Sequence, residues 1–198
     1  IKDGKLYVIN NYSLTTKDYH RTKKFIKQNS GNTEAFMNND IAYKNSTQMD
    51  GSTENRKAMM DIVSQDNGSG GGSDANNREY GGKYDEYGKI IALPAGEVGD
   101  LSKTDVLNYN PENIFHSHAS GTWSTPIDLY NFNTTIGGTT ERRYWIQSPS
   151  QSDIDNCGDR TRYVFGMRDR TVYIYNKNGI QATIPMGLFV NPYNPKKQ

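Results

Sequence analysis

The last third of the sequence carries three short strand candidates. They cover residues 162–167, 171–175 and 181–184, and each has the length and residue content typical of a β-strand. The turn Asn176-Lys177-Asn178-Gly179, between the second and the third, contains the Asn-Gly pair that favours a tight hairpin. The chain is therefore predicted to end in a group of neighbouring strands.

Helical patterns interrupt the strands. Ser52 can cap the free amides ahead of residues 54–63, where apolar side chains recur at helical spacing. A shorter helix is expected from Pro149 to about Asn156. Because helices alternate with strands, we predict an α/β or α+β sandwich rather than an all-β barrel. Further strands are expected at residues 79–84, 88–93 and 112–118.

The first section of the chain offers no functional motif. It contains a strand candidate at residues 6–9 and a polar helix candidate at residues 17–27. We interpret residues 1–50 as an N-terminal extension or lead-in to a domain that covers residues 51–198. The stretch Gly68–Ser73 resembles an engineered linker, and a natural mobile loop fits its composition equally well. No Gly-Lys-Ser/Thr closes this stretch, so it lacks the phosphate-binding pattern.

Composition and charge exclude several classes of protein. Only 33% of the residues are apolar and the mean hydropathy is −0.87, so the core must be small or wrapped in long polar loops. The net charge of +1 gives no reason to expect nucleic-acid binding or a polybasic membrane patch. The longest apolar runs, such as residues 90–93, are far too short to insert across a membrane. Cys157 is the only cysteine, which excludes an intrachain disulfide.

Two histidines stand at the end of one predicted strand, in the stretch Ile114-Phe115-His116-Ser117-His118. Because strand side chains alternate, His116 and His118 share one face, roughly 6.6 Å apart along the backbone. Two imidazoles on one face can converge on a metal ion, although a pair alone does not make a site. The stretch Ser148-Pro149-Ser150-Gln151-Ser152-Asp153 offers a third ligand, because Asp153 would lie one turn into a helix. An ordinary helix cap formed by Ser150 and Asp153 explains the same residues.

The combination of His-x-His with Pro-Ser-x-x-Asp-Ile resembles the metal site of the JAMM/MPN metalloproteases, zinc isopeptidases that cleave ubiquitin-like chains. Within that superfamily the sequence is most similar to JAB-like toxin domains of bacterial polymorphic toxins. The similarity rests on Glu-x-Gly-Gly at 79–82, on His-Ser-His-x-Ser-Gly at 116–121 and on the tail at 163–167. It covers roughly residues 52–190 and implies a JAMM/MPN-like mixed β-sheet flanked by helices.

The resemblance also implies a set of roles. One Zn²⁺ per chain would be held by His116, His118 and Asp153, with water as the fourth ligand, which is the open geometry of a catalytic site. Glu79 would act as general base and Ser150 would stabilise the oxyanion. The reaction would be hydrolysis of a peptide or isopeptide bond. Substitutes for the base are Glu86, Glu97 and Glu112; Cys157 is expected to be a small buried side chain rather than a nucleophile.

The spacing departs from the family pattern. About seven residues usually separate the second histidine from the serine, whereas residues 119–149 intervene here. Asp128, in Thr125-Pro126-Ile127-Asp128, is therefore an alternative third ligand. If Asp153 is the ligand, residues 119–148 form an aromatic-rich insertion. Its Trp123 and Trp145 either line a substrate groove or anchor the insertion to the body of the protein.

Two functions follow from these observations. The first is a zinc-dependent peptidase or isopeptidase that serves as the toxin or effector module of a larger bacterial protein, secreted or delivered at the surface. Its partners would be a protein or peptide substrate, with ubiquitin-like chains as one candidate, and a cognate immunity protein. The second is a JAMM-like binding or structural domain without activity. The opening Ile-Lys-Asp-Gly reads as a piece cut from a longer chain, so the sequence does not encode the compartment.

Overall fold

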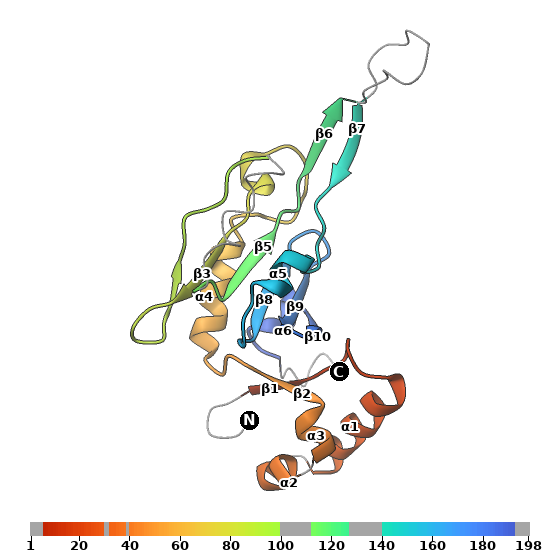
Figure 1. Cartoon of the computed structure of the whole chain (residues 1–198). Coiled ribbons are helices and arrows are strands. Elements are labelled where there is room, and N and C mark those ends of the chain that lie inside the picture. Colours follow the sequence, from red (N-terminus) through yellow and green to blue (C-terminus); the bar gives the residue numbers. More distant parts are fainter. Residues whose placement is uncertain (1–5, 30–31, 39, 100–111, 127–139, 193–198) are drawn as a thin grey trace, which may run out of the picture.

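A six-stranded mixed β-sheet forms the centre of the protein. The computed structural model describes residues 6–29, 32–38, 40–99, 112–126 and 140–192. The strand order is β10-β9-β8-β5-β3-β4; β5 and β8 are parallel, and all other neighbours are antiparallel (Figure 1). The strands are β3 (Gly81–Tyr84), β4 (Ile90–Ala92), β5 (Phe115–His118), β8 (Arg162–Gly166), β9 (Thr171–Asn176) and β10 (Gly179–Pro185). The predicted mixed α/β class is confirmed, as is the hairpin between β9 and β10.

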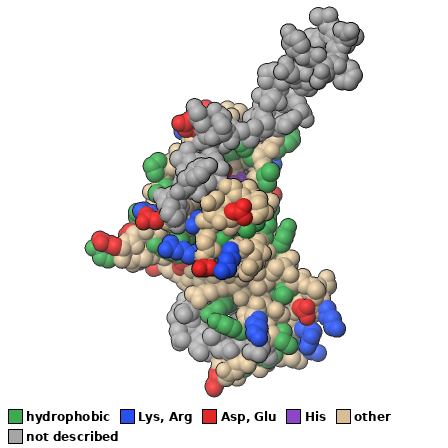
Figure 2. Space-filling view, in the orientation of Figure 1, with side chains coloured by type: hydrophobic (Ala, Val, Ile, Leu, Met, Phe, Trp, Pro, Cys, Tyr) green, Lys and Arg blue, Asp and Glu red, His purple; other side chains and the backbone are tan. Residues whose placement is uncertain are grey.

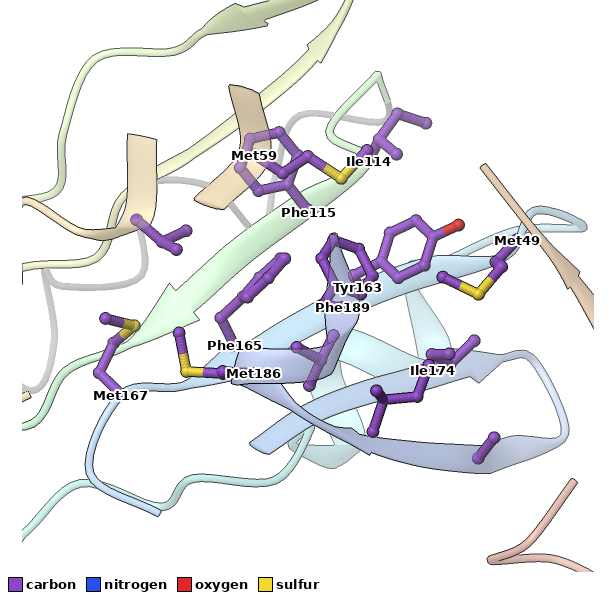
Figure 3. Packing of buried hydrophobic residues seen from close by; sticks show 14 residues of the cluster. Met49, Met59, Ile114, Phe115, Tyr163, Phe165, Met167, Ile174, Met186 and Phe189 are labelled. Carbon is purple, nitrogen blue, oxygen red and sulfur yellow. The ribbon is translucent and has the colours of Figure 1, made fainter. Parts of the chain in front are cut away.

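Helices cover both faces of this sheet. On one face, α4 (Thr53–Val63) and α6 (Met186–Phe189) enclose the main hydrophobic core with the strands. Phe165 packs against both Phe115 and Phe189 in this core (Figure 3), and both ring pairs meet edge to face. The other face carries α5 (Gln151–Asp155) over a smaller cluster of buried apolar residues. That cluster contains Cys157, Val164 and Tyr175.

The start of α4 follows the sequence expectation. The side chain of Ser52 accepts a hydrogen bond from the amide of Asn55, which is the predicted N-cap. Met59 and Val63 then enter the main core, as their helical spacing predicts. Arg56 is also buried, and its guanidinium donates to backbone carbonyls of Asp50 and Phe189. This arginine therefore ties the helix to the chain segments on either side of it.

The N-terminal section packs directly against the sheet. It comprises β1 (Leu6–Ile9), α1 (Thr16–Gln28), α2 (Thr33–Asn38), α3 (Asp40–Lys44) and β2 (Ser46–Met49). Strands β1 and β2 form an antiparallel pair, and Met49 is buried in the main core. The side-chain amide of Asn11 donates to the carbonyl of Thr183 and accepts from its amide, which covers the backbone edge of β10. The short helices α2 and α3 and the strand β2 are elements that the sequence did not predict.

A two-stranded ribbon projects from the body of the protein (Figure 1). Strand β6 (Thr122–Pro126) pairs with β7 (Thr140–Tyr144) in antiparallel register, inside the predicted insertion. The ribbon starts four residues after His118 and ends shortly before α5, so it rises next to the predicted metal ligands.

Figure 2 shows acidic and basic side chains interspersed over the visible face of the protein, in keeping with the small net charge.

Candidate metal centre

Strand β5 places both histidines in the interior of the sheet. It lies between β8 and β3, and all four of its residues are buried. Phe115 enters the main core, whereas His116 pairs with Val164, a member of the smaller cluster beneath α5. The alternation of side chains therefore turns His116 and His118 toward α5, on one face, as the sequence predicted.

Helix α5 brings Asp153 to the same place. Ser150 caps the helix: its side chain accepts from the amide of Asp153, while Asp153 Oδ2 accepts from the amide and hydroxyl of Ser150 at 2.6 and 2.7 Å. This is the capping box that the sequence offered as an alternative explanation. It uses only one carboxylate oxygen for its hydrogen bonds. The other, Oδ1, faces the histidines, so the cap also orients a candidate ligand.

The three side chains converge at the spacing of a tetrahedral metal site. His116 Nε2 lies 3.2 Å from His118 Nε2 and 3.1 Å from Asp153 Oδ1. His118 Nε2 lies 3.5 Å from Asp153 Oδ2. Two ligands of a tetrahedral zinc ion, each about 2.0–2.1 Å from the metal, are ~3.4 Å apart. This buried triad can hold a metal ion.

The hydrogen-bonding pattern agrees with a metal site. Asp153 Oδ1 is buried and accepts no well-aligned hydrogen bond from the described residues, although His116 Nε2 is only 3.1 Å away. His116 Nδ1 is likewise buried without a partner among those residues. Buried polar atoms of this kind are rare and costly unless another group satisfies them. A cation between the donors would satisfy Oδ1.

The side chains of the triad shift one another's pKa values. Burial would raise the pKa of Asp153, but the adjacent imidazoles of His116 and His118 outweigh it and hold the pKa well below its usual range. Burial would lower the pKa of His118, yet Asp153 and Glu79 reverse this effect, and the net shift is upward. The carboxylate therefore stays ionised, and the site attracts positive charge.

Glu79 stands beside the triad. Its Oε1 lies 4.0 Å from His118 Nε2, which is too far for a direct hydrogen bond. The backbone around it is fixed: the amide of Gly96 donates to the Glu79 carbonyl, and the amide of Ser117 donates to the Tyr80 carbonyl. Among the suggested substitutes, Glu112 instead forms an ion pair with Lys83.

The glycine-rich stretch folds back onto the end of β5. Gly68, Gly70 and Gly71 adopt positive φ, which permits its tight turns. The amide of Gly70 donates to the hydroxyl of Ser120, two residues beyond His118. The buried carboxylate of Asp66 accepts from the amide and hydroxyl of Ser120, both at 2.6 Å. The glycine-rich stretch is therefore held by hydrogen bonds next to the candidate metal ligands, unlike a flexible linker.

The insertion is anchored at its base. The indole nitrogen of Trp145 donates to Asn77 at 3.4 Å, and the Gln147 amide donates to the Ala119 carbonyl. Of the two interpretations of Trp145, anchoring to the body is the one that this hydrogen bond supports. Trp123 lies on β6, but its side chain, like all of Asp128, falls outside what the structure describes.

Several supporting residues were not predicted. Asp66 and Arg168 carry no sequence signal, because a buried Asp and a loop Arg acquire partners only when distant segments meet. The guanidinium of Arg168 donates to the carbonyls of Ser120 and Gly121.

Cys157 is buried, as expected, and burial raises the pKa of its thiol, which opposes a nucleophilic role.

Comparisons with protein-family models, with curated proteins and with solved structures find no match to the chain. Within the described residues, no helix has the length and apolar character needed to cross a bilayer.

Proposed function

We propose that this chain is a zinc-dependent hydrolase of peptide or isopeptide bonds, of the JAMM/MPN type. The observation that carries the proposal is the convergence of three buried ligand atoms: His116 Nε2 lies 3.2 Å from His118 Nε2 and 3.1 Å from Asp153 Oδ1, and all three lie within 4.8 Å of one another. Three protein ligands of this kind leave the fourth position of zinc open, as in catalytic zinc sites. A closed structural site would need a fourth side chain.

The chemistry divides between the metal and the chain. Zinc held by the triad would supply a Lewis acid and lower the pKa of water toward ~7. Glu79 would take one proton from the attacking water and pass it to the leaving amine. The water oxygen bonds to the acyl carbon as the carbon–nitrogen bond breaks, so the products are a carboxylic acid and an amine.

Ser150 has a more restricted part in this proposal. Its hydroxyl already donates to Asp153 Oδ2 and accepts from the Asp153 amide. Stabilising an oxyanion therefore requires the hydroxyl to exchange its carboxylate partner for the substrate. While it remains in the cap, Ser150 orients Asp153.

The proposed biological setting follows the resemblance to JAB-like toxin domains. We propose that the chain is the toxin or effector module of a larger bacterial protein, secreted or delivered at the surface. Its substrate would be a protein or peptide, ubiquitin-like chains being one candidate, and a cognate immunity protein would bind it in the producing cell.

Metal content tests the proposal most directly. Protein purified without chelators is expected to contain zinc near one per chain. His116→Ala should lose this zinc, whereas His20→Ala, a matched change on the exposed face of α1, should keep it. Glu79→Gln should keep the zinc and lower peptide hydrolysis by at least about 100-fold.

The opposite results identify the rival function. Protein that takes up no zinc, even when zinc is added, would support a binding or structural domain in which the triad is a hydrogen-bonded polar cluster. Zinc retained equally by His116→Ala would place the metal elsewhere and overturn the proposed site.

A further inference from the structure

The segment that begins at the last residue of β7, residues 144–147, presents alternate side chains to opposite sides. Trp145 and Gln147 turn inward, where they bond to Asn77 and Ala119. Tyr144 and Ile146 turn outward and are 59% and 68% exposed. This is the alternation of an extended chain, and here it leaves two large apolar side chains in solvent.

The same segment borders the metal centre. Asn77, which holds Trp145, lies two residues before Glu79, and Ala119, which holds Gln147, directly follows His118. Residues 144–147 therefore run from the segment of the candidate base to the strand of the candidate ligands.

The exposed pair sits on a fixed support. The amide of Arg168 donates to Gln147 Oε1 at 2.7 Å, and its guanidinium donates to the Ser120 carbonyl. The guanidinium carbon also lies 3.8 Å from the centre of the Tyr144 ring. A contact surface held in this way loses little conformational entropy when a ligand covers it.

We infer that Tyr144 and Ile146 bind an apolar side chain of the substrate next to the scissile bond. The inference rests on the proposed function and specifies its substrate class: an extended peptide segment with a large apolar residue beside the bond that is cut. Single exposed apolar residues are common on protein surfaces. Tyr144 and Ile146 lie on the same side of a segment that Gln147 anchors to the residue directly after His118, so together they form a specific surface.

A pair of peptides tests this inference. They are identical except that the residues flanking the scissile bond are leucine in one and serine in the other. The wild-type protein is expected to cleave the leucine peptide with kcat/KM at least about 10-fold higher, the scale of apolar selectivity in enzymes. Ile146→Ser should reduce this ratio to within about 2-fold while zinc content is unchanged.

Matched variants control for a general loss of apolar surface. Ile91 is 40% exposed on β4, two strands from β5, and Tyr87 is 80% exposed in the turn before β4. Ile91→Ser and Tyr87→Ser should keep the preference for the leucine peptide, whereas Tyr144→Ser should weaken it. An unchanged preference in both Ile146→Ser and Tyr144→Ser would overturn the inference, as would a wild-type protein with no preference.

A binding measurement separates this inference from the proposed function. Both peptides are labelled with a fluorophore, and their affinity for Glu79→Gln protein is measured by fluorescence anisotropy, with and without Ile146→Ser. If the leucine peptide binds more tightly, if this depends on Ile146, and if the wild type does not hydrolyse it, only the proposed hydrolase function is contradicted. Zinc-dependent hydrolysis without any leucine preference in rate or binding would contradict only this inference.

Discussion

At the scale of single residues, Asp153 has two separate tasks. Its Oδ2 accepts two hydrogen bonds from Ser150 at the start of α5, and its Oδ1 lies 3.1 Å from His116 Nε2. The capping bonds fix the rotation of the carboxylate, and this orients the second oxygen toward the histidines. The sequence alone presents a cap and a metal ligand as competing explanations, whereas the geometry allows both at once.

Asp153→Asn separates these tasks. The amide oxygen can still accept from Ser150, but the negative charge that faces the imidazoles is lost. We expect zinc affinity to fall by at least about 100-fold, beyond the 10–100-fold typical of losing a supporting residue. Competition with a fluorescent chelator measures this change. Asp155→Asn, an exposed position of the same helix, should bind zinc like the wild type; equal affinity of both variants would exclude Asp153 as a ligand.

The raised pKa of His118 and the lowered pKa of Asp153 predict an unusual dependence of stability on pH. Without metal, the His118 contribution is fully present below the unfolded pKa of about 6.5 and disappears as pH rises through the folded pKa. The Asp153 contribution is present above about pH 3.9 and disappears as pH falls. The triad's contribution to the metal-free protein should therefore be larger at pH 5.5 than at pH 8.

Zinc should reverse this trend, because it binds only deprotonated ligands and competes with protons for the same nitrogens. Urea midpoints at the two pH values, with chelator and with zinc, measure both effects. His118→Gln serves as the reference that removes the pH-dependent group. The urea midpoint of wild-type protein in chelator is compared with that of His118→Gln at each pH. If the difference rises from pH 5.5 to pH 8, the raised pKa of His118 is contradicted.

At the scale of elements, periodicity predicted the segments whose burial follows a simple pattern. Strands β9 and β10 alternate over most of their length, β8 is a short and largely apolar run that is buried throughout, and helix α4 has an apolar stripe, so all four were expected. Helices α2 and α3 have six and five residues, too few to establish a helical period. Strand β7, Thr-Glu-Arg-Arg-Tyr, lacks alternation, and its last residue is held by the guanidinium of Arg168.

The candidate site shows the same division. The two histidines and Asp153 were found because short motifs encode their local placement on a strand and at a helix start. Asp66 and Gln147 could not be found, since their partners, Ser120 and Ala119, are 54 and 28 residues away. Contacts of this kind depend on tertiary structure, which a single sequence does not display.

The link between Asp66 and Ser120 should stabilise the protein and support the metal site. Asp66→Ala leaves the buried amide and hydroxyl of Ser120, and the amide of Gly68, without their acceptor. We expect a loss of about 2–4 kcal/mol in the free energy of unfolding, measured with urea. Asp61→Ala, on the exposed side of α4, should change it by less than about 0.5 kcal/mol. Similar losses in the two variants would show that the hydrogen bonds between Asp66 and Ser120 contribute little to the free energy of unfolding.

At the scale of the whole molecule, the N-terminal section shares the main core with the sheet. Met49 is 3% exposed in the same cluster as Tyr163, and Leu6 and Val8 pack against that cluster. The hydroxyl of Tyr163 also accepts a hydrogen bond from the amide of Asp50. The predicted boundary near residue 50 therefore does not coincide with a gap in packing, and the stability of the sheet that carries the candidate metal ligands should depend on residues that precede this boundary.

Met49→Ala tests this dependence. Truncating a fully buried methionine removes its transfer free energy and leaves a cavity, which typically costs about 2–5 kcal/mol. Met60→Ala is the matched control, because Met60 lies only partly buried against the same core. We expect Met49→Ala to lower the free energy of unfolding by at least about 1 kcal/mol more than the control does. The Met49→Ala protein should also unfold in a single transition, seen equally by circular dichroism and by tryptophan fluorescence. Two separate transitions, with only the first affected, would mean that the N-terminal section folds independently of the sheet that carries the metal ligands.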